Sequence, residues 1–382
     1  MSDHEHAPPA RLAIFVATSG HSGVDRVVRN LAPAIAARGI AVDVLRVRGH
    51  GPQLDEDPNP LLRVVELEAA HAYTAFFPLV RYLRRERPDA LLTDKDRVNR
   101  IAILAHRLAR SAARLVVRTG TTVSVNLAGR KPMDRRINLW SMRYLYRLAD
   151  AIVLPSRGAG DDFAATVGTA HKRVTVCPSP IATPALYARA REPLDPAILP
   201  GGDGPLLVGI GELSARKDYA TALRAFAALD PGRGARLLIL GEGRKRAELE
   251  ALAHELGVAD RVSLPGFVAN PYPALANADV FVHAARLEGS PVAVMEAVAL
   301  GRPVVSTDCP SGPHEILDGG RIGRLVAIGD HEAMGRALAA MLDEPPPSET
   351  IRAGAAAFTV EASTDAYLDA LGLADRSRPA AT

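Results

Sequence analysis

Residues 281–317 read FVHAARLEGSPVAVMEAVALGRPVVSTDCPSGPHEIL, a pattern that predicts a strand, a loop, a helix and a second strand in that order. The apolar run that ends at His283 is typical of a buried strand, and Val292–Leu300 has the apolar spacing of a helix packed on a sheet. Ser290 is a favoured N-cap residue, and Pro291 suits the first helical position. The helix is therefore expected to begin there and to point free backbone N–H groups at the loop before it.

The loop before this helix has the composition of a site for phosphate and sugar. Gly289 lets a phosphate approach the main chain, and a helix N-terminus carries roughly half a positive charge. Glu288 lies in the loop, and Glu296 lies in the second helical turn. Because carboxylates accept hydrogen bonds from sugar and ribose hydroxyls, a phosphate site between two acids suits a nucleotide sugar. The alternative is a pair of solvated glutamates, since this spacing is common by chance.

The composition is that of a globular chain with two domains. The chain has 382 residues, of which 48% are hydrophobic and 23% charged, and this length suits two domains of roughly 150–200 residues each. Its apolar runs are shorter than the roughly 20 residues that a membrane-spanning helix needs. The formal net charge of +3 is too small to indicate nucleic acid binding by itself.

Cysteine usage and the first residues both favour the cytoplasm. Cys177 and Cys309 are the two cysteines and lie far apart in the sequence, which favours a reducing compartment and argues against a metal cluster. The first ten residues, MSDHEHAPPA, are polar and lack the apolar core of a signal peptide. They are expected to be a disordered lead, and export is not expected.

Residues 11–154 alternate between apolar runs and helical patterns. This alternation predicts a parallel sheet with helices on both faces, and ligands bind at the carboxyl ends of the strands in such sheets. Strands are expected at 11–17, 41–47, 62–67, 89–92, 114–118 and 151–154, and helices at stretches such as 75–87, 97–110 and 135–149.

Polar and glycine residues follow several of these strand ends. Hydrated loops and helix caps are one interpretation of them, with Asp96 as the cap of the helix that follows. Asp94 and Asp96 have the D-x-D spacing of a metal clamp, but the lysine between them argues against a divalent cation. The motif G-x-G-x-x-G is absent from the first loop, so its glycines are weak evidence for a dinucleotide cofactor. The other interpretation is an acceptor or cleft site, for which the candidates are Gly20, Gly23, Asp94, Lys95, Asp96, Asn99 and Arg118.

The second half of the chain opens with an apolar run at 206–211, followed by Glu212 and the basic pair Arg216 and Lys217. Five of the 46 basic residues are lysines. In a chain so rich in arginine, a lysine at a strand end indicates a need for a compact ammonium, as for the charge of a phosphate. A surface pair that caps a helix is the alternative.

Five motifs of the second half follow one another in a distinctive order: G-E-L-x-x-x-K-D at 211–218, L-G-E-G at 240–243, L-P-G-F at 264–267, E-G-S-P at 288–291 with Glu296, and G-P-H-E-I-L at 312–317. This series resembles the donor site of family-four retaining glycosyltransferases of the GT-B fold, the glycosyl transferases group 1. The first loop, G-x-x-G-V-x-R-V at 20–27, resembles the G-G-V-E-R-V of the same family. The resemblance implies an α/β chain with two Rossmann-like, doubly wound parallel-sheet domains that face a cleft.

The resemblance also implies roles for individual residues. Family members have an arginine where this chain has Glu212, and Arg216 beside Lys217 is the natural substitute for it. Catalytic roles are implied for Glu288, Lys217 and Arg216. Donor-binding roles are implied for Gly211, Gly241, Gly243, Phe267, Gly289, Ser290, Val292 and Glu296.

A retaining, metal-independent hexosyl or N-acetylhexosaminyl transferase is the function that the resemblance implies. The donor is a nucleotide-diphosphate sugar, with a UDP-sugar favoured and GDP-mannose possible, and no other cofactor is expected. The acceptor is a glycan or a lipid-linked molecule, as in bacterial envelope or exopolysaccharide synthesis. An inactive GT-B scaffold or binding protein and a GT-B sugar-nucleotide epimerase are the alternatives, because Glu212 replaces arginine and the first half lacks the recognisable histidine of the family.

Domain boundaries are expected where proline and glycine accumulate. The expected divisions are a disordered lead at 1–10, a Rossmann-like acceptor domain at 11–184, a linker at 185–205, a Rossmann-like nucleotide-sugar domain at 206–360, and, at 361–382, a helix that returns to the first domain followed by a tail.

Residues 129–147 form a basic stretch, GRKPMDRRINLWSMRYLYR, with the single tryptophan Trp140. Cations beside Trp, Tyr and Leu are typical of a helix that contacts anionic lipid headgroups. A helix packed in the core is the alternative. Because a buried strand follows at 151, the later half is expected to pack on the sheet, which leaves Arg130–Trp140 as the membrane candidate on the inner face of the cell membrane.

Overall fold

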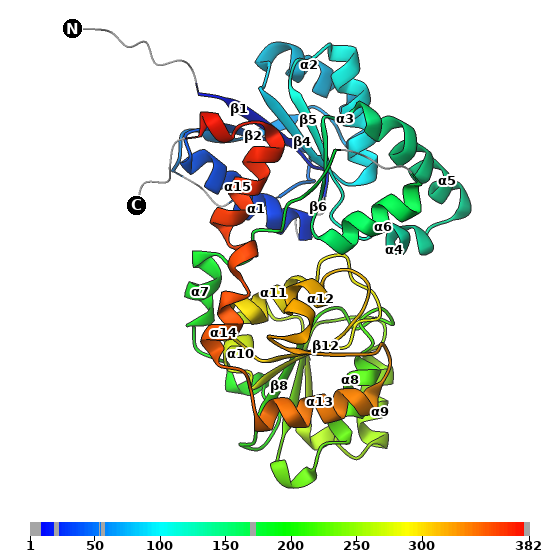
Figure 1. The fold of residues 1–382 in the computed structure, drawn as a ribbon, viewed down its shortest axis with the longest axis vertical. Coiled ribbons are helices and arrows are strands. Elements are labelled where there is room, and N and C mark those ends of the chain that lie inside the picture. The colour runs from blue at the N-terminus through cyan, green and yellow to red at the C-terminus, as the bar shows by residue number, and fades with distance from the viewer. Residues whose placement is uncertain (1–8, 19–22, 53, 55–57, 169–172, 378–382) are drawn as a thin grey trace, which may run out of the picture. The chain divides into compact units, whose positions relative to one another are not determined.

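The computed structural model describes residues 9–18, 23–52, 54, 58–168 and 173–377, so most of the expected lead lies outside the described residues. The chain divides into two compact units. Unit 1 runs to Pro180 and resumes at Val360, and unit 2 is Ile181–Thr359. Each unit is built on one parallel sheet with helices on both faces (Figure 1), which confirms the expected pair of Rossmann-like sheets.

The sheet of unit 1 has seven strands among the described residues, in the spatial order β3-β2-β1-β4-β5-β6-β7, and its neighbouring strands run parallel. Parallel strands need crossover connections, which the helices between them supply. The strands are β1 Arg11–Phe15, β2 Ala41–Val47, β3 Leu62–Leu67, β4 Ala90–Asp94, β5 Arg114–Arg118, β6 Ala151–Leu154 and β7 Val174–Val176.

Two helical layers bury the faces of this sheet. On β1, Leu12 and Ile14 contribute to one core and Ala13 and Phe15 to the other, as the two-residue period of a strand requires. Helices α1 (Gly23–Ala37) and α15 (Val360–Leu371) lie side by side over the first core (Figure 1). The second core is covered by α2 (Phe76–Glu86), α3 (Asp96–Ala109), α4 (Val123–Ala128), α5 (Pro132–Trp140) and α6 (Arg157–Val167). Short 3-10 turns and the π-helical turn Ser141–Leu145 complete the described part of the unit.

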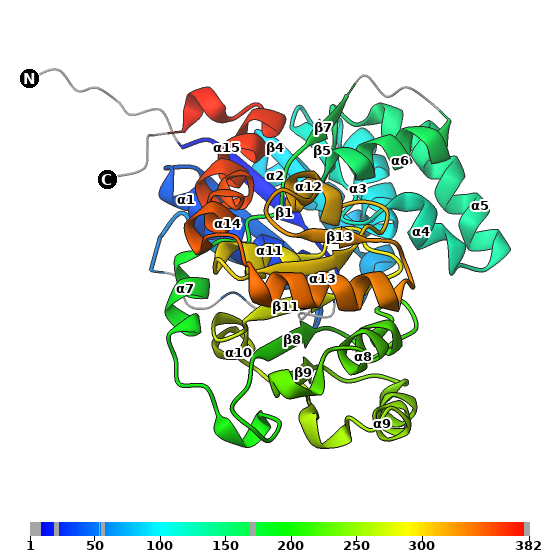
Figure 2. The ribbon, with the colours of Figure 1, turned by 60° about the horizontal axis from the view of Figure 1, so that its bottom comes forward.

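The sheet of unit 2 has six strands among its described residues, in the order β10-β9-β8-β11-β12-β13, again parallel. They are β8 Leu206–Ile210, β9 Arg236–Leu240, β10 Val262–Gly266, β11 Val280–His283, β12 Val304–Thr307 and β13 Arg324–Val326. The helices are α7 Pro184–Ala190, α8 Tyr219–Ala227, α9 Arg246–Glu255, α10 Tyr272–Ala276, α11 Val292–Ala299, α12 Pro313–Ile316, α13 His331–Asp343 and α14 Ser348–Ala353. Figure 2 shows α13 beside α8, where the two share one core, while α11 and α14 share the other.

The segment expected as a linker, 185–205, belongs to unit 2. Most of α7 lies within it, and Arg189 stacks over the ring of Tyr272 at 5.1 Å. The two ends of unit 2 also lie together, because the backbone N–H groups of Ile181 and Ala182 both donate to the carbonyl of Phe358 at 3.0 Å. The first division therefore falls at Pro180 instead of residue 184, since these backbone bonds tie the following residues to unit 2.

A buried carboxylate joins three elements of unit 1. Asp43 on β2 is 1% exposed and pairs in register with Arg63 on β3. Arg63 Nη2 lies 2.8 Å from Asp43 Oδ2, Arg11 Nη1 lies 3.1 Å from the same oxygen, and the hydroxyl of Tyr82 donates to it. Burial alone would raise the pKa of Asp43, but the hydrogen bonds from Arg63, Tyr82 and Arg11 outweigh it and lower the pKa.

We expect Asp43→Asn to lower the free energy of unfolding by about 2 kcal/mol at pH 7, because two arginines and a tyrosine lose a charged partner. A carboxylate whose pKa is lowered by folding stabilises above its unfolded pKa of about 3.9, and this contribution disappears as the pH falls further. The difference between variant and wild type should therefore shrink at pH 3. Urea unfolding followed by the fluorescence of Trp140, which lies in unit 1, measures it.

The matched control for Asp43→Asn is Asp365→Asn, because the Asp365 side chain is 61% exposed and pairs with Arg38. It should change the free energy of unfolding by less than about 0.5 kcal/mol. An Asp43→Asn penalty of the same size at pH 7 and pH 3 would show that the carboxylate charge does not stabilise the sheet.

Candidate functional site

The strand order of unit 2 reverses between β8 and β11. From β8 the chain runs through β9 to β10 on one side, and it then returns to β11 and runs through β12 to β13 on the other side. The loops that follow β8 and β11 therefore separate at the carboxyl edge of the sheet, which is the position where open α/β sheets bind ligands. The G-E-L-x-x-x-K-D and E-G-S-P motifs occupy these two loops.

Glu288 is the centre of a charged cluster at this edge. Its side chain is 5% exposed. Oε1 lies 2.5 Å from Lys217 Nζ, and Oε2 lies 3.1 Å from Arg216 Nη1. On the inner side, Nε2 of His283 lies 3.5 Å from Oε1. The fold thus brings together Glu288, Lys217 and Arg216, the three residues for which the family resemblance implies catalytic roles.

Electrostatics keep Glu288 ionised. Burial by itself would raise the pKa of this carboxyl, but the hydrogen bond from His283 and the positive charge of Lys217 lower the pKa to about 2. Burial lowers the pKa of His283 below its ordinary value, although the hydrogen bond to Glu288 acts in the opposite direction. At neutral pH the cluster therefore combines a carboxylate, a neutral imidazole and two cations.

Helix α11 begins one residue later than the sequence pattern indicated. Pro291 is its N-cap and Val292 its first residue, because the N–H of Val292 donates to the carbonyl of Ser290 at 2.9 Å in a tight turn. Ser290 does not cap the helix, and its hydroxyl is buried with no partner among the described residues. Glu296, in the second turn, is buried and accepts a hydrogen bond from the Tyr272 hydroxyl at 3.1 Å. Neither Glu288 nor Glu296 is a solvated glutamate.

Glycines shape the neighbouring turns. A Cβ on Gly241 would lie 2.0 Å from the carbonyl oxygen of Gly211, and a Cβ on Gly243 would lie 2.2 Å from that of Leu213. The loops after β8 and β9 therefore need these glycines to pack their backbones together. Phe267, after β10, exposes 80% of its surface at the same edge of the sheet, where a planar group could stack on its ring.

The candidates in unit 1 gather at the carboxyl ends of β4 and β5. Arg118 is 3% exposed and pairs with Asp94, while its Nε donates to the Tyr367 hydroxyl at 2.7 Å and its Nη2 to Ser179 Oγ at 3.1 Å. The guanidinium of Arg118 is thus turned into the protein and holds α15 to the sheet. Gly20 lies outside the described residues, and Gly23 is the exposed first residue of α1.

Asp96 and Asn99 belong to a second polar group at this edge. The amide nitrogen of Asn99 donates to the Tyr146 hydroxyl at 2.8 Å, and that hydroxyl donates to Asp96 Oδ1 at 3.1 Å. Asp96 Oδ2 has no partner among the described residues, and burial raises the pKa of this carboxyl. Lys95 is exposed and has a φ of 76°, a conformation that is strained for a residue with a side chain.

Sequence reasoning missed His283 and Tyr272, the partners of the two glutamates. The sequence pattern could have identified His283, because a polar residue in an apolar strand needs a partner that the strand itself does not supply. It could not have identified Tyr272, since the contact of Tyr272 with Glu296 depends on how α10 packs against α11.

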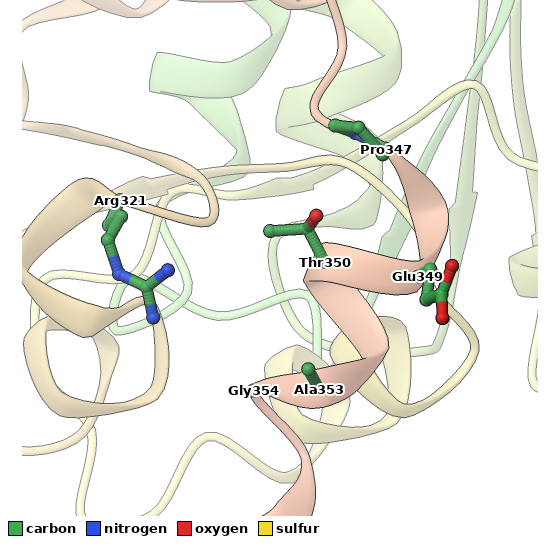
Figure 3. Close-up of a pocket in the computed structure, with 6 residues that line it drawn as sticks. All are labelled: Arg321, Pro347, Glu349, Thr350, Ala353 and Gly354. Carbon is green, nitrogen blue, oxygen red and sulfur yellow. The ribbon is translucent and has the colours of Figure 1, made fainter.

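Unit 2 has a separate hollow of about 390 Å³ beside α14. Figure 3 shows Arg321 on one side of it and Thr350 and Glu349 of α14 on the other. Arg321 is already paired with Asp318 at 2.5 Å. The residues that line the hollow include none of the predicted donor-site residues, so we assign the site to the switch point and not to this hollow.

Two family models match the chain. Residues 204–344 match the model described as Glycosyl transferases group 1, and residues 21–183 match the model described as Glycosyltransferase Family 4. The first match contains the Glu288 cluster, and the second contains most of the sheet of unit 1.

Two curated relatives match over most of their length. The N-acetylgalactosamine-N,N'-diacetylbacillosaminyl-diphospho-undecaprenol 4-alpha-N-acetylgalactosaminyltransferase of Campylobacter jejuni is 28% identical, over 87% of this chain and 90% of that protein. The lipopolysaccharide core biosynthesis glycosyltransferase LpsE of Rhizobium meliloti is 28% identical, over 91% and 95%. Among solved structures, HepE of Anabaena in complex with UDP shares the fold with a TM-score of 0.73 and 18% identity, over 95% of this chain and 99% of HepE.

We expect Lys217→Met to raise the pKa of Glu288 above its value of about 2, because burial then acts against a weaker positive field while the hydrogen bond from His283 remains. NMR titration of the glutamate carboxyl carbons measures this shift. Lys245→Met is the control, since Lys245 pairs with Glu248 on α9. An unchanged Glu288 titration in Lys217→Met would show that the short Lys217 contact does not set the charge state.

Proposed function

The chain belongs to the family-four, group 1 glycosyltransferases of the GT-B fold, and on that premise we propose that it moves a sugar from a nucleotide-diphosphate sugar to a glycan or lipid-linked acceptor with retention of anomeric configuration. A UDP-sugar is the favoured donor and GDP-mannose the second choice. The transferred unit is a hexose or an N-acetylhexosamine. The observation that carries this proposal is the Glu288 cluster, in which two cations and a buried carboxylate meet at the switch point of the unit 2 sheet.

Breaking the bond between the sugar and the diphosphate places negative charge on the leaving phosphate and positive charge on the anomeric carbon. Lys217 and Arg216 supply cations for the phosphate. The N-terminus of α11 adds its partial positive charge. Glu288 supplies a fixed negative charge next to the sugar, where the ring becomes cationic.

Retention implies a reaction on one face of the sugar ring. The acceptor hydroxyl attacks the face that the diphosphate leaves, and the hydroxyl proton passes to an oxygen of the leaving phosphate. The cations hold that oxygen in place, so the donor itself acts as the base. We propose that this chemistry needs no metal ion, as the family generally reacts without one.

Two relatives support an envelope pathway. By name, the Campylobacter enzyme acts on a diphospho-undecaprenol compound and the Rhizobium protein serves lipopolysaccharide core biosynthesis. We therefore propose a lipid-linked or membrane-bound acceptor in the synthesis of a bacterial surface glycan. The acceptor is assigned to the carboxyl edge of the unit 1 sheet, where Lys95 is exposed and Asp96 keeps one oxygen without a partner among the described residues.

An exposed apolar stripe on unit 1 supports contact with a membrane. Its residues recur on one side of α5 and of the π and 3-10 turns that follow, and each exposes 42–68% of its surface: Met133, Ile137, Trp140, Tyr144 and Leu148. The stripe continues eight residues beyond Trp140, where the sequence pattern indicated packing on the sheet. Met142 and Tyr146 make that packing from the opposite side of the same turns.

Exposed cations flank the stripe at Arg130, Lys131, Arg135 and Arg136. Apolar groups with cations on either side suit an anionic membrane surface. None of the helices that the structure describes could span a bilayer. We propose that the stripe and its cations contact the cytoplasmic face of the membrane. The buried free thiols of Cys177 and Cys309 suit that reducing compartment.

A panel of UDP- and GDP-sugars tests the proposed function. A transferase releases nucleotide slowly by hydrolysis even without acceptor, whereas an epimerase gives a free epimer and an inactive scaffold gives no product. Turnover should be unchanged by EDTA, and NMR of the product should show a retained anomeric centre. Lys217→Met should lower turnover about a hundredfold, the usual scale for loss of one preorganised charge at a developing anion.

The two glutamates should have different kinetic roles. Glu296→Gln should mainly raise KM for the donor, because the ribose loses a charged acceptor. Glu288→Gln should lower kcat more than it raises KM, since the charge beside the sugar matters most in the transition state. Steady-state kinetics and melting temperatures of both variants decide the assignment. Interchanged defects would mean that sugar and ribose bind the other way round, and unfolding of both variants would make the pair structural.

Replacing Arg130, Lys131, Arg135 and Arg136 with serine should strongly reduce sedimentation with anionic vesicles, because each cation near such a surface contributes about 1 kcal/mol. Wild-type Trp140 fluorescence should also shift to shorter wavelength with those vesicles. The control replaces four exposed arginines of unit 2 with serine, namely Arg321, Arg324, Arg336 and Arg352. A wild type that stays in the supernatant at low salt would exclude the membrane surface as a partner.

A further inference from the structure

His283 lies behind the charged cluster and touches Glu288 directly. It closes β11, is 4% exposed, and directs Nε2 at Glu288 Oε1 over 3.5 Å. Its other nitrogen, Nδ1, lies 2.9 Å from Ser306 Oγ on the adjacent strand β12. The imidazole is therefore fixed at both nitrogens between two strands and the donor-site loop.

Donor binding changes the partners of Glu288. This argument rests on the proposed function, in which Lys217 and Arg216 bind the donor diphosphate. Both cations contact Glu288 in the structure, and a diphosphate carries more negative charge than one carboxylate. When the cations turn to the diphosphate, Glu288 stays buried but loses its cationic partners. A buried carboxylate that loses compensating positive charge is strongly destabilised.

The described neighbours of His283 leave few other ways to compensate that charge. The titratable and charged groups that act on His283 are Glu288 on its own loop and Lys217 and Arg216 after β8. Tyr219 on α8 and Cys309 after β12 act on Glu288. Burial raises the pKa of Tyr219 and raises the pKa of Cys309 to about 11, so both stay protonated at neutral pH. The imidazole is the group beside Glu288 that can gain a proton near pH 7.

Ser306 can serve both protonation states of the imidazole. Its hydroxyl lies 2.9 Å from His283 Nδ1 and 2.8 Å from the carbonyl oxygen of Thr307. With a neutral ring protonated on Nε2, Ser306 donates to Nδ1. With an imidazolium, Nδ1–H donates to Ser306, and the serine hydroxyl turns to Thr307. Ser306 therefore keeps a hydrogen bond to Nδ1 in both protonation states.

We propose that His283 is a positioning residue that takes up one proton from solvent when the donor diphosphate draws Lys217 and Arg216 away, and so keeps Glu288 ionised and oriented toward the sugar. The proton enters on the imidazole, Nε2–H donates to Glu288, and the net charge of the buried pair becomes zero. Departure of the nucleotide returns the cations to Glu288 and releases the proton. Donor binding and protonation are thereby linked at one residue.

The linkage has a definite sign. In the free protein, burial and the two cations lower the pKa of His283. Once the diphosphate neutralises those cations, Glu288 dominates and the pKa rises. Between the pKa of His283 in the free protein and its pKa in the complex, binding takes up a proton. In this range the nucleotide affinity increases by up to about tenfold for each unit by which the pH falls.

The test is calorimetry of UDP binding at pH 7 in buffers of different ionisation enthalpy. Wild type should take up close to one more proton than His283→Gln, whose amide can still donate to Glu288 but cannot titrate. Using the variant as the baseline removes the ionisation of UDP itself. His254→Gln, an exposed histidine on α9, should behave as wild type. In the wild type, NMR titration of the imidazole nitrogens should show a higher pKa for His283 with UDP bound, a readout that needs no variant.

Equal proton uptake by wild type and His283→Gln, together with an unchanged His283 titration, would overturn the inference while leaving the proposed transferase intact. The variant Ser306→Ala tests the charge of the His283 imidazole separately from its position. It should retain binding but reduce proton uptake, because the imidazolium loses its Nδ1 acceptor. Absence of binding by both UDP and GDP would instead remove the proposed function and this inference with it.

Discussion

The candidate sites at the sheet edges of this chain depend on one constraint, the parallel direction of neighbouring strands in the two described sheets. Parallel strands need a crossover between them, and the crossovers place helices on both faces. The carboxyl ends of the strands therefore share one edge in each unit. In unit 2 this brings the loops after β8 and β11 together, although Lys217 and Glu288 lie far apart in the sequence.

Burial strengthens the attraction between Glu288 and its two cations, and it also makes the removal of those cations unfavourable. A carboxylate in water would interact weakly with Lys217 and Arg216, whereas a buried one must keep compensating partners. Asp43 obeys the same rule in unit 1, but its arginines and tyrosine come from β1, β3 and α2 and are held by the sheet itself. The cations of Glu288 come from a loop. That difference separates a carboxylate that stabilises a fold from one whose partners, as we propose, a ligand replaces.

The sequence predicted the fold because apolar periodicity located the strands. The family resemblance assigned Arg216, Lys217 and Glu288 to one site, and the structure places the three side chains in contact. Contacts between distant side chains were not accessible in this way. The inward turn of Arg118 toward Asp94 and Tyr367 depends on where α15 packs.

The start of α11 differed from the predicted start because the turn at Ser290 uses the backbone carbonyl and not the hydroxyl. The stripe beyond Trp140 was missed because one turn can pack inward through Met142 and outward through Tyr144.

The return of α15 to unit 1 has a consequence for synthesis on the ribosome. Unit 2 is one continuous segment, whereas unit 1 needs residues from both sides of it. Leu12, Ile14 and Leu31 form a core that Tyr367 and Leu371 complete. At about 5–20 residues per second, the ribosome makes the intervening segment in on the order of 10–40 s. During that interval the first core lacks the side chains of α15, so the apolar residues that this helix covers stay uncovered until it emerges.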